Sequence, residues 1–551
     1  MKRTVTKRIG LLVAMLLSVL PMLADYFEVD GICYSVISNT EQTCEVVKNA
    51  YWKYRGDIVI PSEVSYHSKT LKVTEIGNCA FECCSSLTSV IIPESVTKIG
   101  EWAFNDCTSL TSMIIPDSVT EIGEWAFSDC TSLTSVVIPN SVTEMKSFVF
   151  DGCSSLTSVI IGNSVTKIGQ YAFRDCSSLT SVIIPESVTE IGERAFYNCS
   201  SLTSIDIPES VTEIGYSAFG NCSSLTSIDI PESVTTIGQS AFGNCSSLTS
   251  IDIPHSVTEI SCFGGCTSLT SVVIPESVTE IGGVAFKDCS SLTSVYIPEL
   301  VTTIGYCAFE GCSSLTSIDI PDSVTEIGEH AFKSCSSLTS IDIPESVTEI
   351  GECAFKGCSS LTSVYIPESV TKIDQEAFFG CKSLVTVVIS YSVVKLNIGA
   401  SLFDKSVIEN LFIDRELNKS LSLPSLKELT LGEHVTKVQI DPTKADALES
   451  ITCYAPEPPT CPKFTNAQYL NTVVKVPKVS LEKYQQADGW KNFWNLEGFD
   501  AGESAVDEVL VDESIREIGR CDINGKSVDA DYNGIVIVRY SDGTTKKILN
   551  K

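Results

Sequence analysis

The sequence predicts a solenoid, a stack of about fourteen short coils with a parallel β-sheet on one face, a cap at each end and a small C-terminal β domain. Three observations predict it. A leucine recurs every 23 residues, with one interval of 21; the same apolar pattern follows each leucine; and the pattern fades towards both ends. Such a fixed period is typical of solenoids. The leucines are Leu87, Leu110, Leu133, Leu156, Leu179, Leu202, Leu225, Leu248, Leu269, Leu292, Leu315, Leu338, Leu361 and Leu384.

Residues 1–24 have the form of a secretory leader. Four basic residues precede an apolar run over 9–20, and the segment ends at Ala24. This order is typical of a cleaved signal peptide, and the run is too short to span a bilayer. We expect cleavage after Ala24, which takes the net charge from −31 to −35. The protein is therefore expected to be exported, to the cell surface, the outer membrane or the surrounding medium, with no transmembrane span.

The composition excludes several classes of function. A net charge of −31 disfavours nucleic acid and anionic lipid as partners, because both attract basic surfaces. The four histidines, His67, His255, His330 and His434, are widely scattered. We therefore expect neither a histidine-rich metal site nor a catalytic centre built on several histidines.

One coil shows how the fold is expected to form. In the unit that begins at Leu202, Ile205 and Ile207 alternate with polar residues, which predicts a short strand. Residues 211–214 predict a second extended piece, and Ser217–Cys222 a short helical or 3₁₀ turn that carries Phe219 inward. A single unit cannot bury these side chains, so the core must come from stacking. The 21-residue unit predicts a local kink or loosened turn near Ser261–Gly265.

The repeated run LTSIDIPESVTEIGYSAFGNCSS closely resembles the BspA-like, or treponemal-type, leucine-rich repeat. The resemblance covers residues 72–392. It implies a right-handed leucine-rich-repeat arc with a parallel sheet on one face. It also implies a role at the bacterial cell surface, commonly adhesion to host matrix or plasma proteins; this part is analogy with the family.

The segments beside the repeats are expected to close the stack. Residues 25–71 contain strand-like pieces and form the N-terminal β cap. Residues 393–497 contain degenerate repeats and a C-terminal cap, and 498–511 form an acidic linker. The cap is expected to hold an amphipathic lid whose aromatic side chains cover the last coil. These side chains are Tyr484, Trp490, Phe493 and Trp494.

Residues 512–551 predict a separate small β unit. Its strands are expected to turn at Asn524-Gly525 and Asp542-Gly543, both strong hairpin signals. DINGKSV, GIVIVRY and the basic end KKILNK resemble the C-terminal sorting domain of the type IX secretion system. That resemblance implies recognition at the outer membrane, with the chain anchored there or released. The alternative is a second C-terminal cap.

Fourteen of the 24 cysteines stand three residues before a repeat leucine. Stacked equivalents lie about 4.8 Å apart with parallel Cα–Cβ bonds, whereas a disulfide needs converging Cβ atoms about 3.8 Å apart. We therefore expect a ladder of buried thiols. The cap pairs Cys33/Cys44 and Cys453/Cys461 are the places where a loop-closing disulfide is an open alternative.

The fifth residue of each coil, counted from its leucine, is expected to point outward, because strand side chains alternate between faces. We call this set the outward column. Its neighbours are mostly Thr and Ser, whereas the column itself varies. It runs Ile91, Ile114, Val137, Ile160, Ile183, Asp206, Asp229, Asp252, Val273, Tyr296, Asp319, Asp342, Tyr365 and Val388.

Two properties of this column suggest a contact surface. Its first five members form an apolar stripe, which indicates either a contact surface or the ordinary preference of strands for β-branched residues. Its aspartates repel one another along the sheet, so folding alone does not favour them. They indicate an anionic patch for a basic partner or a calcium site, unless they are copies from a recent duplication. The expected ligand-binding residues are Asp206, Asp229, Asp252, Tyr296, Asp319, Asp342 and Tyr365.

These features predict a surface-displayed, adhesin-like binding protein. Its expected partners are proteins or glycoproteins of the host matrix, plasma or neighbouring cells. The alternative is a structural spacer or surface-layer component with no specific ligand. No nucleophile motif or phosphate-binding loop is present in the sequence, so we expect no enzymatic activity. We expect a monomer without a cofactor, with calcium as the alternative.

Overall fold

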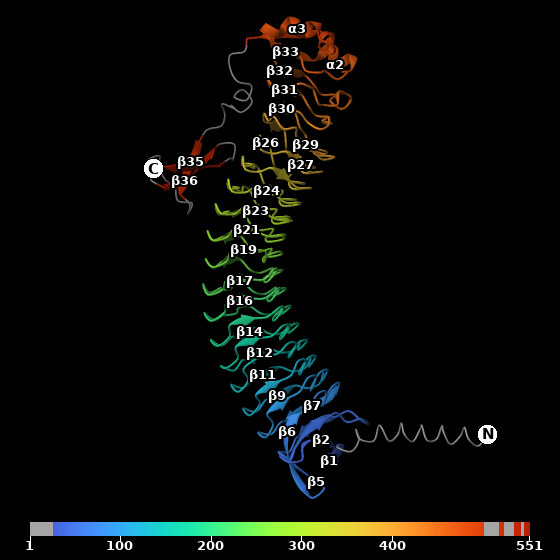
Figure 1. Cartoon of the computed structure of the whole chain (residues 1–551), viewed down its shortest axis with the longest axis vertical. Coiled ribbons are helices and arrows are strands. Elements are labelled where there is room, and N and C mark those ends of the chain that lie inside the picture. Colours follow the sequence, from blue (N-terminus) through green and yellow to red (C-terminus); the bar gives the residue numbers. More distant parts are fainter. Residues whose placement is uncertain (1–25, 501–516, 523–533, 541–544, 551) are drawn as a thin grey trace, which may run out of the picture. The chain divides into compact units, whose positions relative to one another are not determined.

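The computed structural model describes residues 26–500 and three further strands, β35 (Glu517–Asp522), β36 (Gly534–Tyr540) and β37 (Thr545–Asn550). The chain divides into two compact units, the first ending at Leu248 and the second beginning at Thr249, and each is described by itself (Figure 1). The expected leader over 1–24, and most of the expected linker, lie outside the described residues.

The first unit begins with a small sheet whose strands are mostly antiparallel. Strand β2 pairs with β1 and β3, and β6 pairs antiparallel with β5 and parallel with β3. The Tyr54 hydroxyl donates to the carbonyl oxygen of Val47 and accepts from the N–H of Cys33. The strands of this sheet are β1 (Tyr26–Val29), β2 (Ile32–Ser38), β3 (Thr43–Val47), β5 (Glu63–Tyr66) and β6 (Lys69–Ile76), whereas β4 (Arg55–Val59) belongs to a separate sheet with the first strands of the coils.

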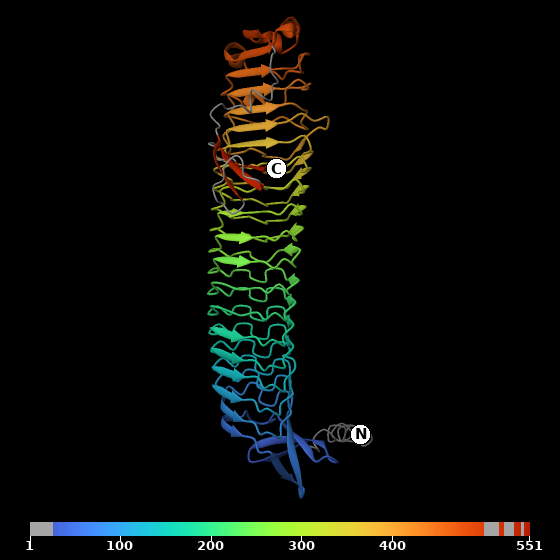
Figure 2. The ribbon, with the colours of Figure 1, turned by 90° about the vertical axis from the view of Figure 1, so that its left-hand side faces the viewer.

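The coils of the first unit add one parallel strand each to two sheets, because equal coil lengths keep equivalent residues in register (Figure 2). The first strands of the coils are β7 (Ser86–Ile91), β9 (Ser112–Ile114), β11 (Ser135–Val137), β12 (Ser158–Ile160) and β14 (Ser181–Ile183). The second strands are β8 (Lys98–Ile99), β10 (Glu121–Ile122), β13 (Lys167–Ile168), β15 (Glu190–Ile191), β16 (Glu213–Ile214) and β17 (Thr236–Ile237).

The second unit repeats this arrangement. Its first strands are β18 (Ser250–Asp252), β20 (Ser271–Val273), β22 (Ser294–Val295), β26 (Ser363–Ile366), β28 (Thr386–Ile389), β30 (Asn410–Ile413), β31 (Glu428–Leu431), β32 (Ser450–Cys453), β33 (Val473–Pro477) and β34 (Asn495–Phe499). Its second strands are β19 (Glu259–Ile260), β21 (Glu280–Ile281), β23 (Thr303–Ile304), β24 (Glu326–Ile327), β25 (Glu349–Ile350), β27 (Lys372–Ile373) and β29 (Asn397–Ile398). The predicted solenoid of stacked coils of about 23 residues with parallel strands is confirmed.

The third side of each coil is a run of turns and not a continuous helix, so the prediction of a helical or 3₁₀ turn over Ser217–Cys222 was only partly right. Ser217 and Asn221 have positive φ angles of 49° and 62°. The N–H groups of Ser217, Phe219 and Asn221 donate to carbonyl groups of the next coil at 2.7–3.0 Å. The N–H groups between them, of Ala218, Gly220 and Cys222, donate to the carbonyl three residues earlier, as in a 3₁₀ turn. Every second donor therefore bonds to the neighbouring coil.

Stacking lines the apolar residues into continuous columns. In the coil that begins at Leu202, the side chains of Leu202, Val211, Ile214 and Phe219 are fully buried. The Phe219 ring stacks between those of Phe196 and Phe242, at centroid distances of 5.4 and 5.5 Å. Each coil therefore contributes to a core that no single coil could form.

The predicted ladder of buried thiols is confirmed. From Cys107 to Cys245 the repeat cysteines are buried and free, and each Sγ–H donates to the carbonyl oxygen of the phenylalanine 26 residues earlier. Cys33, Cys44, Cys453 and Cys461 are also free thiols.

The short coil of the second unit loses two residues from its turn. Phe263 still donates to the carbonyl of Ala285, and its ring stacks on that of Phe286 with an interplanar angle of 18°. The next four phenylalanine stacks, from Phe286 to Phe378, are more nearly parallel, with interplanar angles of 2–13°. The shortened turn is therefore present near Ser261–Gly265, and the kink stays a prediction.

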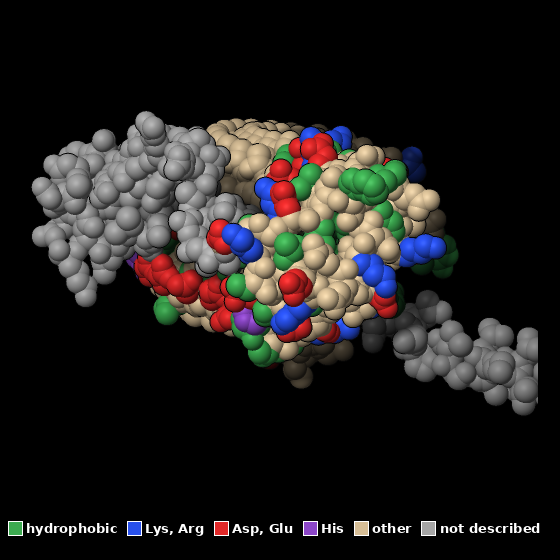
Figure 3. All heavy atoms as spheres, turned by 90° about the horizontal axis from the view of Figure 1, so that it is seen from above, with side chains coloured by type: hydrophobic (Ala, Val, Ile, Leu, Met, Phe, Trp, Pro, Cys, Tyr) green, Lys and Arg blue, Asp and Glu red, His purple; other side chains and the backbone are tan. Residues whose placement is uncertain are grey.

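Two helices, α2 (Asn466–Asn471) and α3 (Leu481–Gln486), lie at the end of the second unit. Tyr484, Trp490 and Phe493 are buried there, but Trp494 is 80% exposed, so its predicted place in the lid was wrong. Hydrophobic side chains are scattered among charged ones on the surface at this end (Figure 3). No helix in the described part of the chain is long and apolar enough to cross a membrane.

The tail contains the predicted strands. β36 pairs antiparallel with both β35 and β37. The predicted turn residues, Asn524-Gly525 and Asp542-Gly543, lie outside the described residues.

Candidate functional site

The outward column of the first unit points away from the core. In β11, β12 and β14 the middle residue is buried and the residues on either side are exposed. Register pairs Ile91 with Ile114, Val137 with Ile160, and Ile160 with Ile183. These five apolar side chains are between 53% and 82% exposed. They form a row on the open face of the sheet.

The row extends one strand further towards the N-terminus than predicted, to Val59. Val59, in β4, pairs with Ile91 and is 62% exposed. The segment Asp57–Pro61 reads DIVIP, and the repeats carry SVIIP at Ser89–Pro93. This similarity was the sequence feature from which Val59 could have been predicted to join the row, although residues 25–71 lie outside the 23-residue period. We call Val59, Ile91, Ile114, Val137, Ile160 and Ile183 the apolar stripe.

Asp206 and Asp229 continue the column of the first unit. Bridges pair Ile183 with Asp206 and Asp206 with Asp229, and both carboxylates are exposed. Among the described residues neither aspartate has an ion-pair partner. In these two coils the sheet is reduced to isolated bridges, whereas the isoleucine and valine coils form three-residue strands. The strand pairing is thus shorter at Asp206 and Asp229 than in the isoleucine and valine coils before them.

The second strands of the coils also carry stacked acidic residues, for example Glu121, Glu190 and Glu213. Glu121 lies 2.6 Å from Lys146 and 3.3 Å from Lys98, and Glu190 lies 2.8 Å from Lys167. The hydrogen bond from Lys146 is the main cause that lowers the pKa of the Glu121 carboxyl. Lysine thus neighbours glutamate in some of these coils, whereas in others glutamates pair directly in register, as Glu190 does with Glu213 and Glu259 with Glu280.

The threonine column beside the outward column is engaged in the fold. The hydroxyl of Thr203 donates to the carbonyl of Thr180, and that of Thr226 donates to the carbonyl of Thr203, each at 3.4 Å. The same bond recurs along both units, for example from Thr316 to Thr293. The threonine hydroxyls therefore form a ladder of bonds to the backbone, and the outward column is the part of this face that differs from coil to coil.

The second unit carries the other predicted site residues. Asp252 pairs with Val273, and Tyr296 pairs with Asp319. The Tyr296 hydroxyl donates to Glu276 at 3.2 Å. Asp252, Asp319 and Asp342 are exposed. Exposed apolar residues follow one another here only at Val273 and Tyr296, in contrast to the longer run of the first unit.

Tyr365 is not a free anchor. It is partly buried against a cluster of Val388, Phe412 and Tyr454, and Val388 is only 3% exposed. Phe499 packs on the same cluster, with its ring 5.1 Å from that of Tyr454. Aromatic side chains therefore cover the outward column at this point.

No group of three or more His, Cys, Asp or Glu that could hold a metal ion occurs among the described residues. Within either unit the aspartates of the outward column form at most adjacent pairs. The calcium alternative has no further ligand to support it in the described part.

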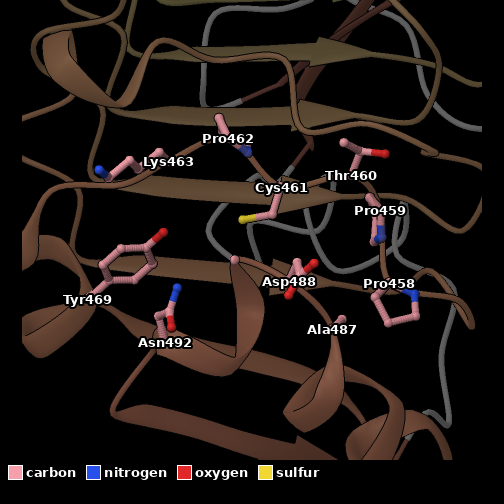
Figure 4. A pocket seen from close by; sticks show the side chains of 11 residues that line it. Pro458, Pro459, Thr460, Cys461, Pro462, Lys463, Tyr469, Ala487, Asp488 and Asn492 are labelled. Carbon is pink, nitrogen blue, oxygen red and sulfur yellow. The ribbon is translucent and has the colours of Figure 1, made fainter.

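Two hollows lie away from the outward column. One of about 500 Å³ has Cys461 between Tyr469 and Asn492 on one side and Asp488 and the Pro458–Pro459 segment on the other (Figure 4). Asp488 is already paired with Lys491, at 2.5 Å. The second hollow, of about 370 Å³, includes Glu45, whose pKa is raised by burial and by Glu75. Glu45 and Glu75 pair in register across β3 and β6.

The repeats match a known family over most of the chain. The family described as the BspA type leucine rich repeat region matches residues 63–180, 166–292, 259–385 and 348–453. No curated protein matches the chain.

Several solved structures are similar. A leucine-rich repeat protein from Bacteroides ovatus is 34% identical, with a TM-score of 0.59, and the match covers 67% of this chain and 94% of that chain. A protein from Faecalibacterium prausnitzii, described as a leucine rich cell surface protein, is 36% identical, with a TM-score of 0.46 and coverage of 67% and 95%. The extent of the family match and the likeness to the Bacteroides protein show that this chain belongs to the BspA-type leucine-rich repeat family.

Proposed function

We propose that this protein is an exported, surface-displayed binding protein of the adhesin type, which engages a protein or glycoprotein through the outward column of its sheet. One observation carries the proposal. The outward column is exposed and changes from coil to coil, while the threonines beside it form the same backbone bonds throughout. A surface that varies on a constant scaffold is suited to recognition.

The aspartates add support. Like charges directly opposite each other on a sheet are destabilising, and Asp206 and Asp229 stand in adjacent coils without a cation between them. A basic group of a partner would relieve this repulsion, so the pair supports a binding role. Binding is also favoured over catalysis, because these carboxylates stand on an open face that does not exclude water.

Display at the surface is supported by the leader-like residues 1–24 and by membership of the BspA-type family. The tail strands β35–β37 are compatible with the proposed sorting role, for which the resemblance of residues 512–551 is the argument. We propose partners in host matrix, in plasma or on neighbouring cells, with the protein acting as a monomer.

The test compares two double variants of the full chain in binding to immobilised host matrix and plasma proteins. Asp206→Ser with Asp229→Ser changes the outward column. Glu209→Ser with Glu232→Ser removes the same charge from the exposed turns of the same coils and is the matched control. We expect the first variant to lose at least tenfold in affinity and the control to bind like the wild type.

A further variant, Tyr296→Ser, examines the second unit. If the aspartate and Tyr296 variants all bind like the wild type, the outward column is not the site. The alternative of a structural spacer, whose repeats only set length, is then favoured.

A further inference from the structure

The outward column of the first unit has two chemically distinct parts. Its first part is the apolar stripe, six side chains that are each more than half exposed, on two groups of three parallel strands: Val59, Ile91 and Ile114, then Val137, Ile160 and Ile183. Its second part is the Asp206–Asp229 pair, joined to the stripe by the bridge from Ile183 to Asp206. Contiguous exposed apolar surface commonly marks a contact site.

Strand preference alone does not explain the stripe. In the second unit the same position holds Asp252, Val273, Tyr296 and Asp319, and those coils keep the same core and the same threonine bonds. The coil accepts polar residues here. An unbroken run of six exposed Val and Ile residues is therefore not required by the fold.

The spacing of the stripe favours a helical partner. Neighbouring strands lie about 4.8 Å apart, and an α-helix rises about 5.4 Å per turn. A helix laid along the stripe thus offers about one apolar side chain to each coil. In an extended chain, the side chains on one face are about 6.6 Å apart, which does not match the spacing of the strands. Six stripe residues span about 24 Å, or roughly sixteen residues of helix.

The two aspartates determine which side chains the partner needs at the Ile183 end of the stripe. Asp206 and Asp229 are exposed, and no described side chain forms an ion pair with them, whereas Glu121 is held by two lysines. A partner that follows the stripe to this end meets the two carboxylates and complements them with Lys or Arg. Basic residues are most favourable in the last turn of a helix. The C-terminal turns of the partner helix therefore lie over the aspartates.

We propose that the first unit binds an amphipathic α-helix of a partner protein, with one apolar residue per turn along the stripe and Lys or Arg in its last two turns above Asp206 and Asp229. This inference rests on the proposed function, because it names the class of partner for the same outward column. Exposed Ser135, Ser158 and Ser181 form a hydroxyl row beside the stripe and face the polar flank of the helix.

The test uses a labelled synthetic helix of twenty residues, with a leucine in each turn and lysines in the last two turns, and fluorescence anisotropy with the full chain. A second peptide of the same composition carries the lysines in its first two turns. We expect the first peptide to bind at least tenfold more tightly than the second, and its circular dichroism to gain helix on binding.

Variants of the chain locate the contact. Ile114→Ser with Ile160→Ser is expected to weaken binding tenfold or more, while Asp206→Asn with Asp229→Asn weakens it and reduces its salt dependence. Val273→Ser, at an equally exposed position of the outward column in the second unit, is the matched control and should bind like the wild type. Circular dichroism of each variant confirms that the coils still fold.

Three results overturn the inference: no binding of the peptide, equal binding by all variants, or wild-type self-association that the isoleucine variant abolishes. The last result identifies a second copy of this chain as the occupant. If the aspartate variant still loses adherence to matrix or plasma proteins while no peptide binds, the proposed function stands and only the helical partner is wrong.

Discussion

The thiol of Cys222 donates a hydrogen bond to the carbonyl oxygen of Phe196, with 3.3 Å between the sulfur and the oxygen. The bond joins a coil to the coil before it, and equivalent bonds recur along the stack. Since each cysteine donates its proton to the backbone, its role is that of a buried polar clamp between coils. It does not act as half of a disulfide.

Stability should therefore fall at alkaline pH. Burial raises the pKa of the Cys222 thiol and raises that of Cys381 to about 12, from an ordinary value near 9. The folded state holds these protons while the unfolded chain releases them, so the contribution is complete below the unfolded pKa and is lost as pH rises above it. We expect the free energy of unfolding to be nearly constant from pH 6 to 8 and to fall steeply by pH 9.5.

Denaturant unfolding at a series of pH values measures this effect, and labelling with a thiol reagent at pH 8 provides the control. The repeat thiols should react only after unfolding. A stability that is flat to pH 9.5, or a native chain whose unfolding temperature drops on reduction, contradicts the assignment of free, protonated thiols.

Phe219→Ala should be strongly destabilising. The ring is fully buried between Phe196 and Phe242, so its removal leaves a cavity that the neighbouring rings cannot close. We expect a loss of about 3–5 kcal/mol in the free energy of unfolding. Tyr216→Ala changes an exposed ring of the same coil and should cost less than about 1 kcal/mol. Equal losses for the two variants would show that the phenylalanine stack is not the core.

The fold was predictable because repetition turns a local pattern into a column. Leu202, Ile205, Val211 and Phe219 recur at constant spacing, so stacking was the arrangement that buried all of them. The conformation of Ser217–Cys222 was not predictable from one coil. Every second backbone donor of this segment bonds to the following coil, and that competition with a continuous helical turn is visible only once two coils are placed together.

The alternation of side chains along a strand predicted which residues of the site are exposed, but only within the regular coils. Asp206 and Asp229 are exposed in the expected register. Alternation could not show that Tyr365 is partly covered, because Phe412, Tyr454 and Phe499 come from coils that have lost the 23-residue period. Val59 was missed for the related reason that its strand precedes the regular repeats.

In one irregular coil, Arg415 makes the hydrogen bond that a serine makes in the regular coils. In regular coils a serine hydroxyl donates to a valine carbonyl of the coil before, as Ser346 does to Val324. The equivalent Ser392 instead accepts a bond from the N–H of Val394. The buried guanidinium of Arg415 donates to the carbonyl of Val370 in its place, at 2.8 Å, and also to those of Pro367 and Glu368.

Arg415→Met should therefore cost about 2–4 kcal/mol in the free energy of unfolding, because it leaves buried carbonyl groups without donors. Burial lowers the pKa of Arg415 to about 10, so the side chain remains charged at neutral pH and its bonds are charge-assisted. Lys372→Met, which removes a half-exposed lysine paired with Glu349 and Asp374, is the control and should cost less than about 1 kcal/mol. A neutral Arg415→Met would mean that water or a neighbouring group satisfies these carbonyls.

The last prediction separates folding from binding at Asp206 and Asp229. Their carboxylates face each other in register without a cation, so Asp206→Asn or Asp229→Asn should raise the free energy of unfolding by about 0.5–1 kcal/mol at low salt. In about 1 M salt, where screening acts over roughly 3 Å, the gain should shrink.

Glu121→Gln is the opposite case, since Glu121 is held by Lys98 and Lys146. It should lower stability slightly at neutral pH. Because its pKa is lowered in the folded state, the contribution of Glu121 exists above the unfolded pKa and is lost as pH falls. Denaturant unfolding of the three variants at two salt concentrations distinguishes the cases. If the asparagine variants prove less stable than the wild type, the aspartates serve the fold, and the reason to assign them to a partner disappears.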